Sequence, residues 1–233
     1  MRKQAILLAA IAIVAMAAPV ALAANPVRIS QVYGGGGGAS GTYIYDYVEL
    51  FNYGGAVADI SGWTIEYGSA TGNWGSSTSN IFTFPEGTTM QPCAYVLVQC
   101  GAAGSGGVAF PVTPDFIQAA GLSMSATSGK VGLFTAANSN LACGSELAGT
   151  LVDKVAYGTA TCAEGTAVGA LSQTSGAVRL LNGATDTDNN SADFIIESAS
   201  LVPRNSAPGQ WDPGCLSTPA EYPTWGALKS AYR

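Results

Sequence analysis

The most regular alternation of hydrophobic and polar residues lies between residues 46 and 67, and it predicts two neighbouring β-strands. Trp63, Ile65 and Tyr67 share one face of the second strand, because side chains two positions apart on a strand point the same way. Asn, Asp and Gly residues between the strands supply turn chemistry. Trp63 is expected to anchor the core, because no neighbouring side chain can bury more apolar area.

Further short apolar runs recur along the chain, separated by clusters of Gly, Pro, Asn and Ser. No helical period is sustained between them, so the pattern predicts an all-β sandwich of two sheets with long loops. Residues 94–99 are apolar on both faces, which is typical of a central strand. Residues 69–80 are expected to form an exposed loop that carries Trp74. The remaining predicted strands are residues 27–33, 81–84, 130–135, 150–157, 177–181 and 192–197.

Several of these strands and turns occur as sequence motifs in a fixed order. The motifs are VRISQVY (27–33), DYVELFN (46–52), ISGW (60–63), YVLVQ (95–99), MSATSGKV (124–131), DTDNNSADF (186–194) and PRNS (203–206). In this ordered series the chain resembles the lamin tail domain family, in its bacterial secreted form. The resemblance implies an immunoglobulin-like β-sandwich. It implies little about activity, because the family serves as a binding or structural module beside many different partners.

The two ends of the chain differ from its body in composition. Met1-Arg2-Lys3 is followed by an apolar stretch and by Ala21-Leu22-Ala23, which is the order of a secretory signal peptide and its cleavage site. We therefore expect export, with residues 1–23 removed and no later membrane-spanning segment. Residues 24–206 would form the sandwich, and residues 207–233 a proline-containing linker and C-terminal tail.

The last ten residues have a pattern of their own. Trp225, Leu228 and Tyr232 fall at i, i+3 and i+7, the spacing of one side of a short helix. The sequence leaves two interpretations of Trp225–Arg233 open. It is either a tail that docks back on the sandwich or a terminal tag recognised by export or surface-attachment machinery.

The charge of the chain limits its partners. Nine Lys and Arg stand against fifteen Asp and Glu, and loss of Arg2 and Lys3 with the signal peptide leaves seven basic residues and a net charge of −8. Seven scattered cations cannot easily form the basic face that nucleic-acid binding needs. No nucleic-acid partner is expected, and the protein is expected to be secreted, periplasmic or at the cell surface.

Five cysteines in an exported chain predict disulfides with one thiol left over. Cys143 and Cys162 bracket a predicted strand in turn-like surroundings, and we expect them to pair. Cys93 and Cys100 flank another strand, which separates them by roughly 23 Å at about 3.3 Å per residue, so they cannot pair with each other. The sequence does not decide which of these two bonds to Cys215.

The sequence contains no histidine, which excludes Ser-His-Asp and Cys-His nucleophile systems. Asp46 and Glu49 could form a pair of catalytic carboxylates, but at three residues apart on a strand they project to opposite faces. Glu49 is instead expected to be satisfied by backbone donors or by Arg28 or Arg179. We therefore expect no enzyme. The alternatives are a hydrolase that uses carboxylates and a metal, or an accessory module of a secreted nuclease system.

One loop carries a candidate metal site. Asp186, Asp188 and Asn190 occupy alternate positions, and Glu197 follows eleven residues after the first, which copies ligand positions 1, 3, 5 and 12 of a calcium loop. Ser191 stands where such a loop has Gly, and Asx-turn chemistry leading into a strand explains the same pattern. A structural Ca²⁺ held by these four residues is a hypothesis, and no other cofactor is expected.

The expected role is therefore non-catalytic: an exported module that binds a protein, a glycan or itself at the cell surface or in the matrix. Tyr43, Tyr45 and Trp74, in loops that we expect to be exposed, are the predicted contact residues, because Tyr and Trp dominate interface energetics. The sequence leaves the ligand and the oligomeric state open.

Overall fold

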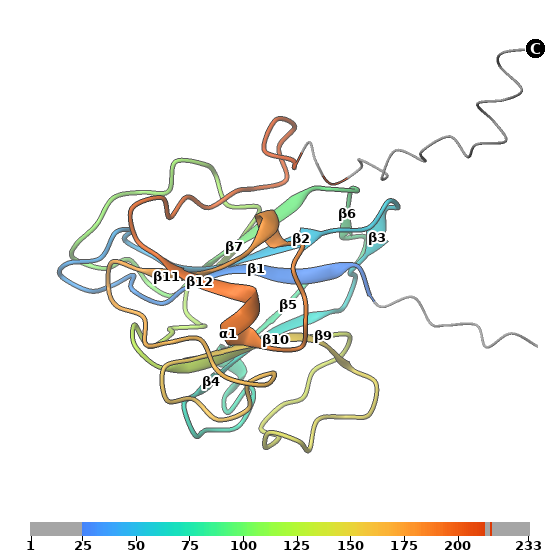
Figure 1. Cartoon of the computed structure of the whole chain (residues 1–233), viewed down its shortest axis with the longest axis horizontal. Coiled ribbons are helices and arrows are strands. Elements are labelled where there is room, and N and C mark those ends of the chain that lie inside the picture. The colour runs from blue at the N-terminus through green and yellow to red at the C-terminus, as the bar shows by residue number, and fades with distance from the viewer. Residues whose placement is uncertain (1–24, 213–214, 216–233) are drawn as a thin grey trace, which may run out of the picture.

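The computed structural model describes residues 25–212 and residue 215, which form two β-sheets packed face to face (Figure 1). The predicted signal peptide and the tail Trp225–Arg233 lie outside the described residues. Neighbouring strands of the larger sheet are antiparallel, except for the parallel pair β7 and β8. This sheet has the spatial order β12 (Phe194–Glu197), β11 (Gly176–Arg179), β1 (Val27–Tyr33), β2 (Asp46–Asn52), β7 (Tyr95–Cys100) and β8 (Phe116–Gln118).

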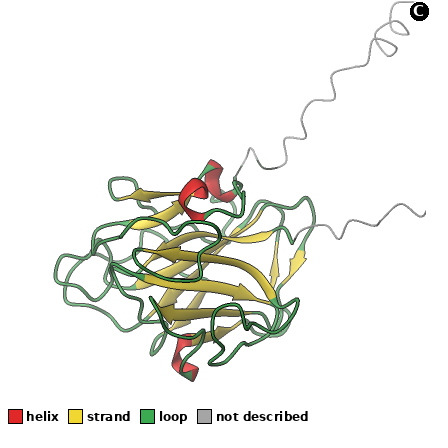
Figure 2. Cartoon of the chain, turned by 60° about the horizontal axis from the view of Figure 1, so that its bottom comes forward, coloured by secondary structure: helices red, strands yellow, loops and turns green. Residues whose placement is uncertain are grey.

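The second sheet and the small elements complete the sandwich, and Figure 2 shows the strands layered with the helical turns at the margins. The second sheet has the order β10 (Leu151–Tyr157), β9 (Gly129–Phe134), β4 (Thr64–Ser69) and β5 (Ile81–Thr83). The small elements are β3 (Ala58–Asp59), β6 (Thr89–Met90), η1 (Thr78–Asn80), η2 (Leu181–Gly183) and α1 (Asn190–Asp193). The prediction of an all-β, two-sheet sandwich is confirmed. Within the part of the chain that the structure describes, no helix has the length and apolar character to span a bilayer.

The predicted alternation of side chains holds in the central strand β2. Val48 and Leu50 enter the main core between the sheets, whereas Tyr47 and Phe51 pack into separate clusters on the outer face. All seven residues of β2 are buried, including the carboxylate of Glu49. The larger sheet is therefore covered on both faces, which the alternating pattern alone does not predict.

A β-bulge alters the alternation in β1. Ile29 pairs with Leu50 and Gln31 pairs with Glu49, so Ser30 is an extra residue in the ladder. Strict alternation would place Val32 on the face opposite Ile29, but both side chains lie in the main core.

The prediction that Trp63 anchors the core is wrong, because Trp63 is only partly buried and Trp74 is completely buried. Residues 69–80 are not simply an exposed loop. The Trp74 backbone forms a bridge with Leu141, and its ring meets Phe134 edge-on at 5.4 Å between centroids. The loop after β9 thus covers a side chain whose polar, Gly-rich sequence surroundings suggested exposure.

The cysteines are paired as the sequence allowed. Cys143 and Cys162 form the predicted disulfide, and Cys93 bonds to Cys215. Cys100 is a free, buried thiol. The disulfide to Cys215 and the hydrogen bond from Asp212 N–H to the Cys93 carbonyl (3.1 Å) hold the end of the described chain against the outer face of the larger sheet.

Candidate functional site

A groove of about 320 Å³ opens on the outer face of the larger sheet, over β1, β11 and β12. Its walls come from three stretches of chain: the turn that follows β11, strand β12, and the segment that follows β12. The residues that line it are Gln31, Val178, Arg179, Leu180, Leu181, Asn182, Ile195, Ser200, Val202 and Arg204, and none of them is a carboxylate.

Apolar side chains are concentrated at this groove. Leu181 is 76% exposed, Val202 50% and Ile195 44%, and Ile196 on the same edge strand is 48% exposed. Leu181 has a positive φ of 50°, which is uncommon for a residue other than glycine. Exposed apolar side chains that gather around one concavity are typical of a binding surface, whereas single exposed ones are normal.

The floor of the groove is held by an ion pair between Arg204 and Glu49. The Arg204 Nη2 atom lies 2.7 Å from Glu49 Oε1, and the Arg204 backbone N–H donates to Oε2 at 2.6 Å. Ser30 Oγ also donates to Oε1, at 2.5 Å. Burial is the largest single influence and disfavours the charged guanidinium, but the charge and hydrogen bonds of Glu49, together with Tyr95 and Tyr47, outweigh it and raise the pKa of Arg204. Of the expected partners of Glu49, a backbone donor is present in the Arg204 N–H, whereas the neutralising cation is Arg204 and not Arg28 or Arg179.

Arg204 also reaches the neighbouring aromatic side chains. Its guanidinium lies 3.7 Å from the centre of the Tyr95 ring, and Nη1 donates to the Tyr95 hydroxyl at 2.7 Å. That hydroxyl donates in turn to the carbonyl of Asn182 at 2.8 Å. Arg204 therefore connects the segment after β12 to the turn after β11, and these two stretches form facing walls of the groove.

Another arginine, Arg179, is buried between the sheets. Its Nη2 atom is 2.6 Å from Asp153 Oδ2 in strand β10 of the other sheet, and its Nε–H donates to the Ile29 carbonyl at the bulge. Asp153 Oδ2 also accepts the Ile29 N–H at 2.7 Å. The guanidinium lies 4.4 Å from the Phe194 ring centre. Arg179 thus fastens the two sheets at the point where β1 loses its regular ladder.

The predicted calcium ligands contact three different parts of the protein. Asp186 lies 3.4 Å from Arg28 and 3.6 Å from Arg179. Asn190 is buried, and its Oδ1 atom accepts the Ala156 N–H at 2.9 Å. The remaining two predicted ligands are Asp188, which is exposed, and Glu197, which accepts N–H groups from Ser198 and Ser200.

Asp193 has the role of an Asx cap in this loop. Its carboxylate accepts the Thr187 N–H at 2.9 Å and the Asn189 N–H at 3.3 Å. The loop is thus organised by hydrogen bonds of its own, as the alternative interpretation of the sequence expects. Calcium binding stays a prediction, and thermal unfolding in millimolar calcium against a chelator tests it. A rise in melting temperature would support it, and an unchanged one would argue against it.

The predicted aromatic contact residues do not form an exposed set. Tyr43 is 6% exposed, and its hydroxyl donates to the Leu201 carbonyl at 2.6 Å. Trp74 is buried, and only Tyr45 is partly exposed. The expectation of exposure is wrong for Tyr43 and Trp74, because the long loops fold back over the sandwich and cover their large rings.

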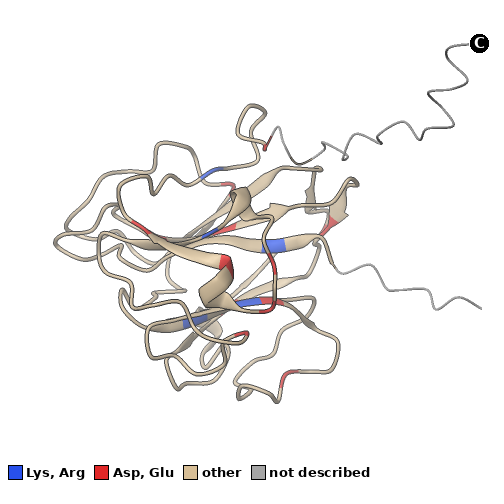
Figure 3. Ribbon diagram, viewed as in Figure 1, with Lys and Arg blue, Asp and Glu red and all other residues tan. Residues whose placement is uncertain are grey.

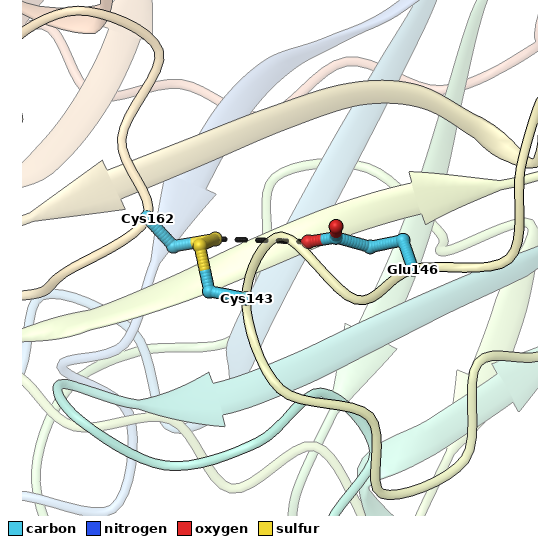
Figure 4. Close-up of side chains that lie close together, drawn as sticks. All are labelled: Cys143, Glu146 and Cys162. Atoms are coloured by element: carbon cyan, nitrogen blue, oxygen red, sulfur yellow. Dashed lines mark hydrogen bonds between the residues drawn. A yellow bond between two sulfur atoms is a disulfide. The ribbon is translucent and has the colours of Figure 1, made fainter.

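Cys143, Glu146 and Cys162 bring three ligand-type side chains within 4.8 Å of one another, the one such group among the described residues (Figure 4). The two sulfurs are bonded to each other in the disulfide, so they are not thiolates and cannot bind a metal as such. Glu146 instead accepts the Trp74 indole N–H at 2.7 Å. The disulfide and the Glu146 hydrogen bond together hold the loop after β9 in place over Trp74.

Asp46 is a buried carboxylate with no arginine beside it. One oxygen accepts the Met124 N–H at 2.7 Å, and the other has no hydrogen-bond partner. Burial raises the pKa of Asp46 to about 7, although the nearby backbone N–H groups of Met124 and Gly36 oppose this rise.

The comparison with protein families settles the family. The profile of the Lamin Tail Domain family matches residues 21–159. This chain belongs to that family. A search of curated proteins finds no match. Among solved structures, the chain is similar to a DUF4876 family protein from Bacteroides thetaiotaomicron, at 14% identity and a TM-score of 0.50, over 78% of this chain and 69% of that one. At this identity the likeness shows the fold alone.

Most of the groove of this lamin tail domain lies beyond the segment that the family profile covers. Of the lining residues, only Gln31 falls within residues 21–159. The groove is built on β11, β12 and the segment through Arg204, so the family match by itself assigns it no role. Arg204 belongs to the PRNS motif that carries part of the resemblance, but no feature of the sequence identifies its partner.

Proposed function

We propose that this lamin tail domain is an exported, non-catalytic binding module that makes its contacts through the groove. The observation that carries the proposal is the concentration of exposed Leu, Ile and Val side chains around one concavity, next to a rigid floor formed by Arg204 and Glu49. A rigid apolar site with a few polar groups is the usual form of a recognition surface. The partner we propose is a protein or glycan outside the cytoplasm, with apolar surface to bury.

Charge and disulfides support the external setting. The structure contains two disulfides, which persist in oxidising compartments. Charged residues are few and are spread over the sandwich (Figure 3). The basic residues of the described part of the chain are Arg28, Lys130, Lys154, Arg179 and Arg204, too few to form easily the basic face that a nucleic-acid partner would need.

The test compares binding to a cell-envelope fraction by the wild-type protein and by the variant Leu181→Glu/Ile195→Glu. Val57→Glu/Val108→Glu is the matched control, because these side chains are 53% and 64% exposed and do not line the groove. We expect the groove variant to lose at least tenfold in affinity and the control to bind like wild type. Equal binding by all three proteins would refute the proposal.

The same preparation tests the hydrolase alternative. Asp153, Asp186 and Asp193 gather around Arg179, at 2.6 to 3.9 Å from its guanidinium. Hydrolysis of a glycan that persists in the groove variant and disappears in Asp186→Asn would favour a carboxylate-dependent enzyme over a binding module.

A further inference from the structure

We propose that the groove binds the C-terminal end of a partner polypeptide, with the terminal carboxylate at Arg204 and the last aliphatic side chains along the apolar walls. This inference rests on the proposed binding role of the groove, and it names the chemistry of the partner. The occupant is an apolar, anionic chain end that belongs to another protein outside the cytoplasm.

The charge that the groove exposes is that of Arg204. Two arginines and no carboxylate line the groove, but the guanidinium of Arg179 is fully buried and bonds to Asp153 between the sheets. The side chain of Arg204 is 18% exposed, whereas its partner Glu49 lies completely buried beneath it. A ligand that enters the groove therefore contacts the cation of this ion pair and not the anion.

Arg204 has hydrogen-bond donors left after its contacts within the protein. Its Nε and Nη2 atoms donate to Glu49, and Nη1 donates to the Tyr95 hydroxyl. Each Nη atom of a guanidinium carries a pair of N–H groups, so one N–H on each Nη atom of Arg204 has no acceptor among the described residues. A carboxylate suits these two donors, because the planar fork of Arg matches its two oxygens.

The groove has a cationic end and an acidic end. Outer-face residues pair in register across four neighbouring strands, in the order Ile195, Val178, Gln31 and Glu49. Arg204 lies over Glu49 on the β2 side, whereas Glu197 lies on the edge strand β12 and accepts the N–H of the lining residue Ser200. Three strand spacings of about 4.8 Å separate the two ends by about 14 Å. A carboxylate in the groove is therefore favoured at Arg204 and disfavoured near Glu197.

The groove stops at Arg204. The Tyr95 hydroxyl accepts from Arg204 Nη1 and donates to the Asn182 carbonyl, so it joins the two facing walls, and Tyr95 itself does not line the groove. A chain end can stop at this junction. An internal segment that carries Asp or Glu would have to continue over it, so the closed end favours a terminal carboxylate over a side-chain carboxylate.

The apolar lining determines the side chains of the chain end. Leu181, Ile195 and Val202 come from three different stretches of chain and are all exposed, so they can contact a bound segment from both sides. Burial of aliphatic side chains against them removes apolar area from water. A length of about 14 Å accommodates about four extended residues at about 3.3 Å each. We therefore expect the last four residues of the partner to occupy the groove.

The test uses the chain from Ala24 with labelled Ile, Leu and Val methyl groups, observed by NMR. The probes are the peptide acetyl-Ala-Leu-Ala-Val with a C-terminal carboxylate and the same peptide with a C-terminal amide. We expect the acid to shift the methyl signals of Leu181, Ile195 and Val202 and to bind at least tenfold more tightly than the amide. The signals of Val57 and Val108, which are exposed elsewhere, should stay in place. Equal affinities for acid and amide, or unchanged groove signals, would overturn the inference.

The variant Glu49→Gln separates the charge of Arg204 from the shape of the groove. It removes the competing anion with a side chain of the same size, so the acid should bind at least threefold more tightly than to wild type, and the amide as before. Leu181→Glu should abolish binding of the acid, and the matched control Val57→Glu, which is exposed away from the groove, should not. Unchanged binding of the acid by Glu49→Gln would contradict the role of Arg204.

A salt titration of the wild-type protein does not depend on the folding of any variant. Raising the NaCl concentration from about 50 mM to about 500 mM should weaken the acid at least threefold and leave the amide unchanged, because salt screens the carboxylate from Arg204. A ratio of acid to amide affinity that does not respond to salt would also overturn the inference.

Decanoate tests the other source of an apolar carboxylate. Its single unbranched chain cannot fill the space between both walls, so we expect it to bind at least fivefold more weakly than the peptide acid. Decanoate that binds as tightly as the peptide, or more tightly, would identify a lipid as the ligand and overturn the assignment to a protein.

The two proposals fail in different ways. If neither peptide shifts the groove signals while Leu181→Glu/Ile195→Glu still loses its envelope partner, chain-end recognition is wrong and the binding role stands. If the acid binds as expected but no envelope partner depends on the groove, the carboxylate site is real and the binding role in the envelope is wrong. If both hold, the peptide acid should displace the envelope partner at a concentration at least tenfold lower than the amide needs.

Discussion

Arg179 and Arg204 each pair with a buried carboxylate, but in different places. Arg179 is fully buried between the sheets, and it neutralises Asp153 of the opposite sheet at the β1 bulge. The side chain of Arg204 is 18% exposed on the outer face, and it neutralises Glu49 beneath the groove. A buried carboxylate is costly unless it is paired and hydrogen-bonded. The comparison indicates that Arg179 closes the sandwich, whereas Arg204 attaches the segment after β12 and shapes the groove.

The largest expected effect is that of Arg179→Met. This change leaves Asp153 buried without its cation, so we expect the free energy of unfolding to fall by about 3–5 kcal/mol, measured by urea denaturation. Arg179→Met/Asp153→Asn removes the orphaned charge and keeps an oxygen for the Ile29 N–H. The double variant should regain part of the loss, and a double variant less stable than the single one would contradict the proposed pairing.

Arg204→Met should cost less, about 2–3 kcal/mol of unfolding free energy, because Glu49 keeps the hydrogen bonds from Ser30, Gln31 and the residue 204 N–H. The same urea titration measures it. Arg204→Lys should fall between wild type and Arg204→Met, because an ammonium cannot reproduce the forked contact. A loss as large as that of Arg179→Met would remove the distinction between the two arginines.

Asp46 sharpens the comparison, because it is a buried carboxylate that neither arginine neutralises. Its pKa is raised to about 7 in the folded protein, from about 3.8 in the unfolded chain, so the folded state holds the extra proton between these values. Stability from this group is therefore present at low pH and is lost as pH rises toward 7. Between pH 5 and pH 7 we expect its contribution to the unfolding free energy to fall by about 2 kcal/mol.

The variant Asp46→Asn isolates this effect, because it has no proton to lose and keeps an acceptor for the Met124 N–H. Urea denaturation at pH 5, 6 and 7 should show a steeper decline with pH for wild type than for the variant. Equal slopes, or a steeper decline in the variant, would show that Asp46 does not lose its proton between pH 5 and pH 7.

The smallest expected effect on stability is that of Leu181→Ser at the groove. The side chain is 76% exposed, so its replacement should change the unfolding free energy by no more than about 0.5 kcal/mol. Together with the two arginine variants, this result would distinguish the arginine contacts that stabilise the fold from the exposed groove side chain that is free to bind. A loss above 1 kcal/mol would mean that Leu181 is already covered.

Much of the strand framework follows from local pattern. The strand Val27–Tyr33 was predicted with its observed bounds, and the alternation in residues 46–52 placed Val48 and Leu50 correctly in the core. The Cys143–Cys162 pair was predictable because both residues sit in turns that flank one strand. Local pattern failed at Trp74, because a Gly- and Ser-rich stretch suggests exposure and only the distant loop 135–150 reveals the cover.

The candidate site was not predictable in the same way. Nothing near Glu49 in the sequence points to Arg204, which lies 155 residues later. The groove needs β11, β12 and the segment through Arg204 to meet on one face. Leu181 and Ile195 look in sequence like ordinary strand residues, but Leu181 lies in the turn η2 and Ile195 in the edge strand β12, and both side chains are exposed.

The sequence by itself determined the all-β class, most strand positions, one disulfide, the lack of imidazole chemistry and the family. These properties depend on the period of side chains along a strand, on composition and on short motifs, all of which are local. The tertiary structure alone decided which arginine neutralises which carboxylate, which cysteine bonds to Cys215, and where apolar side chains remain uncovered. Those outcomes depend on contacts between residues far apart in the chain. For the carboxylates, burial also makes an unpaired charge too costly to leave.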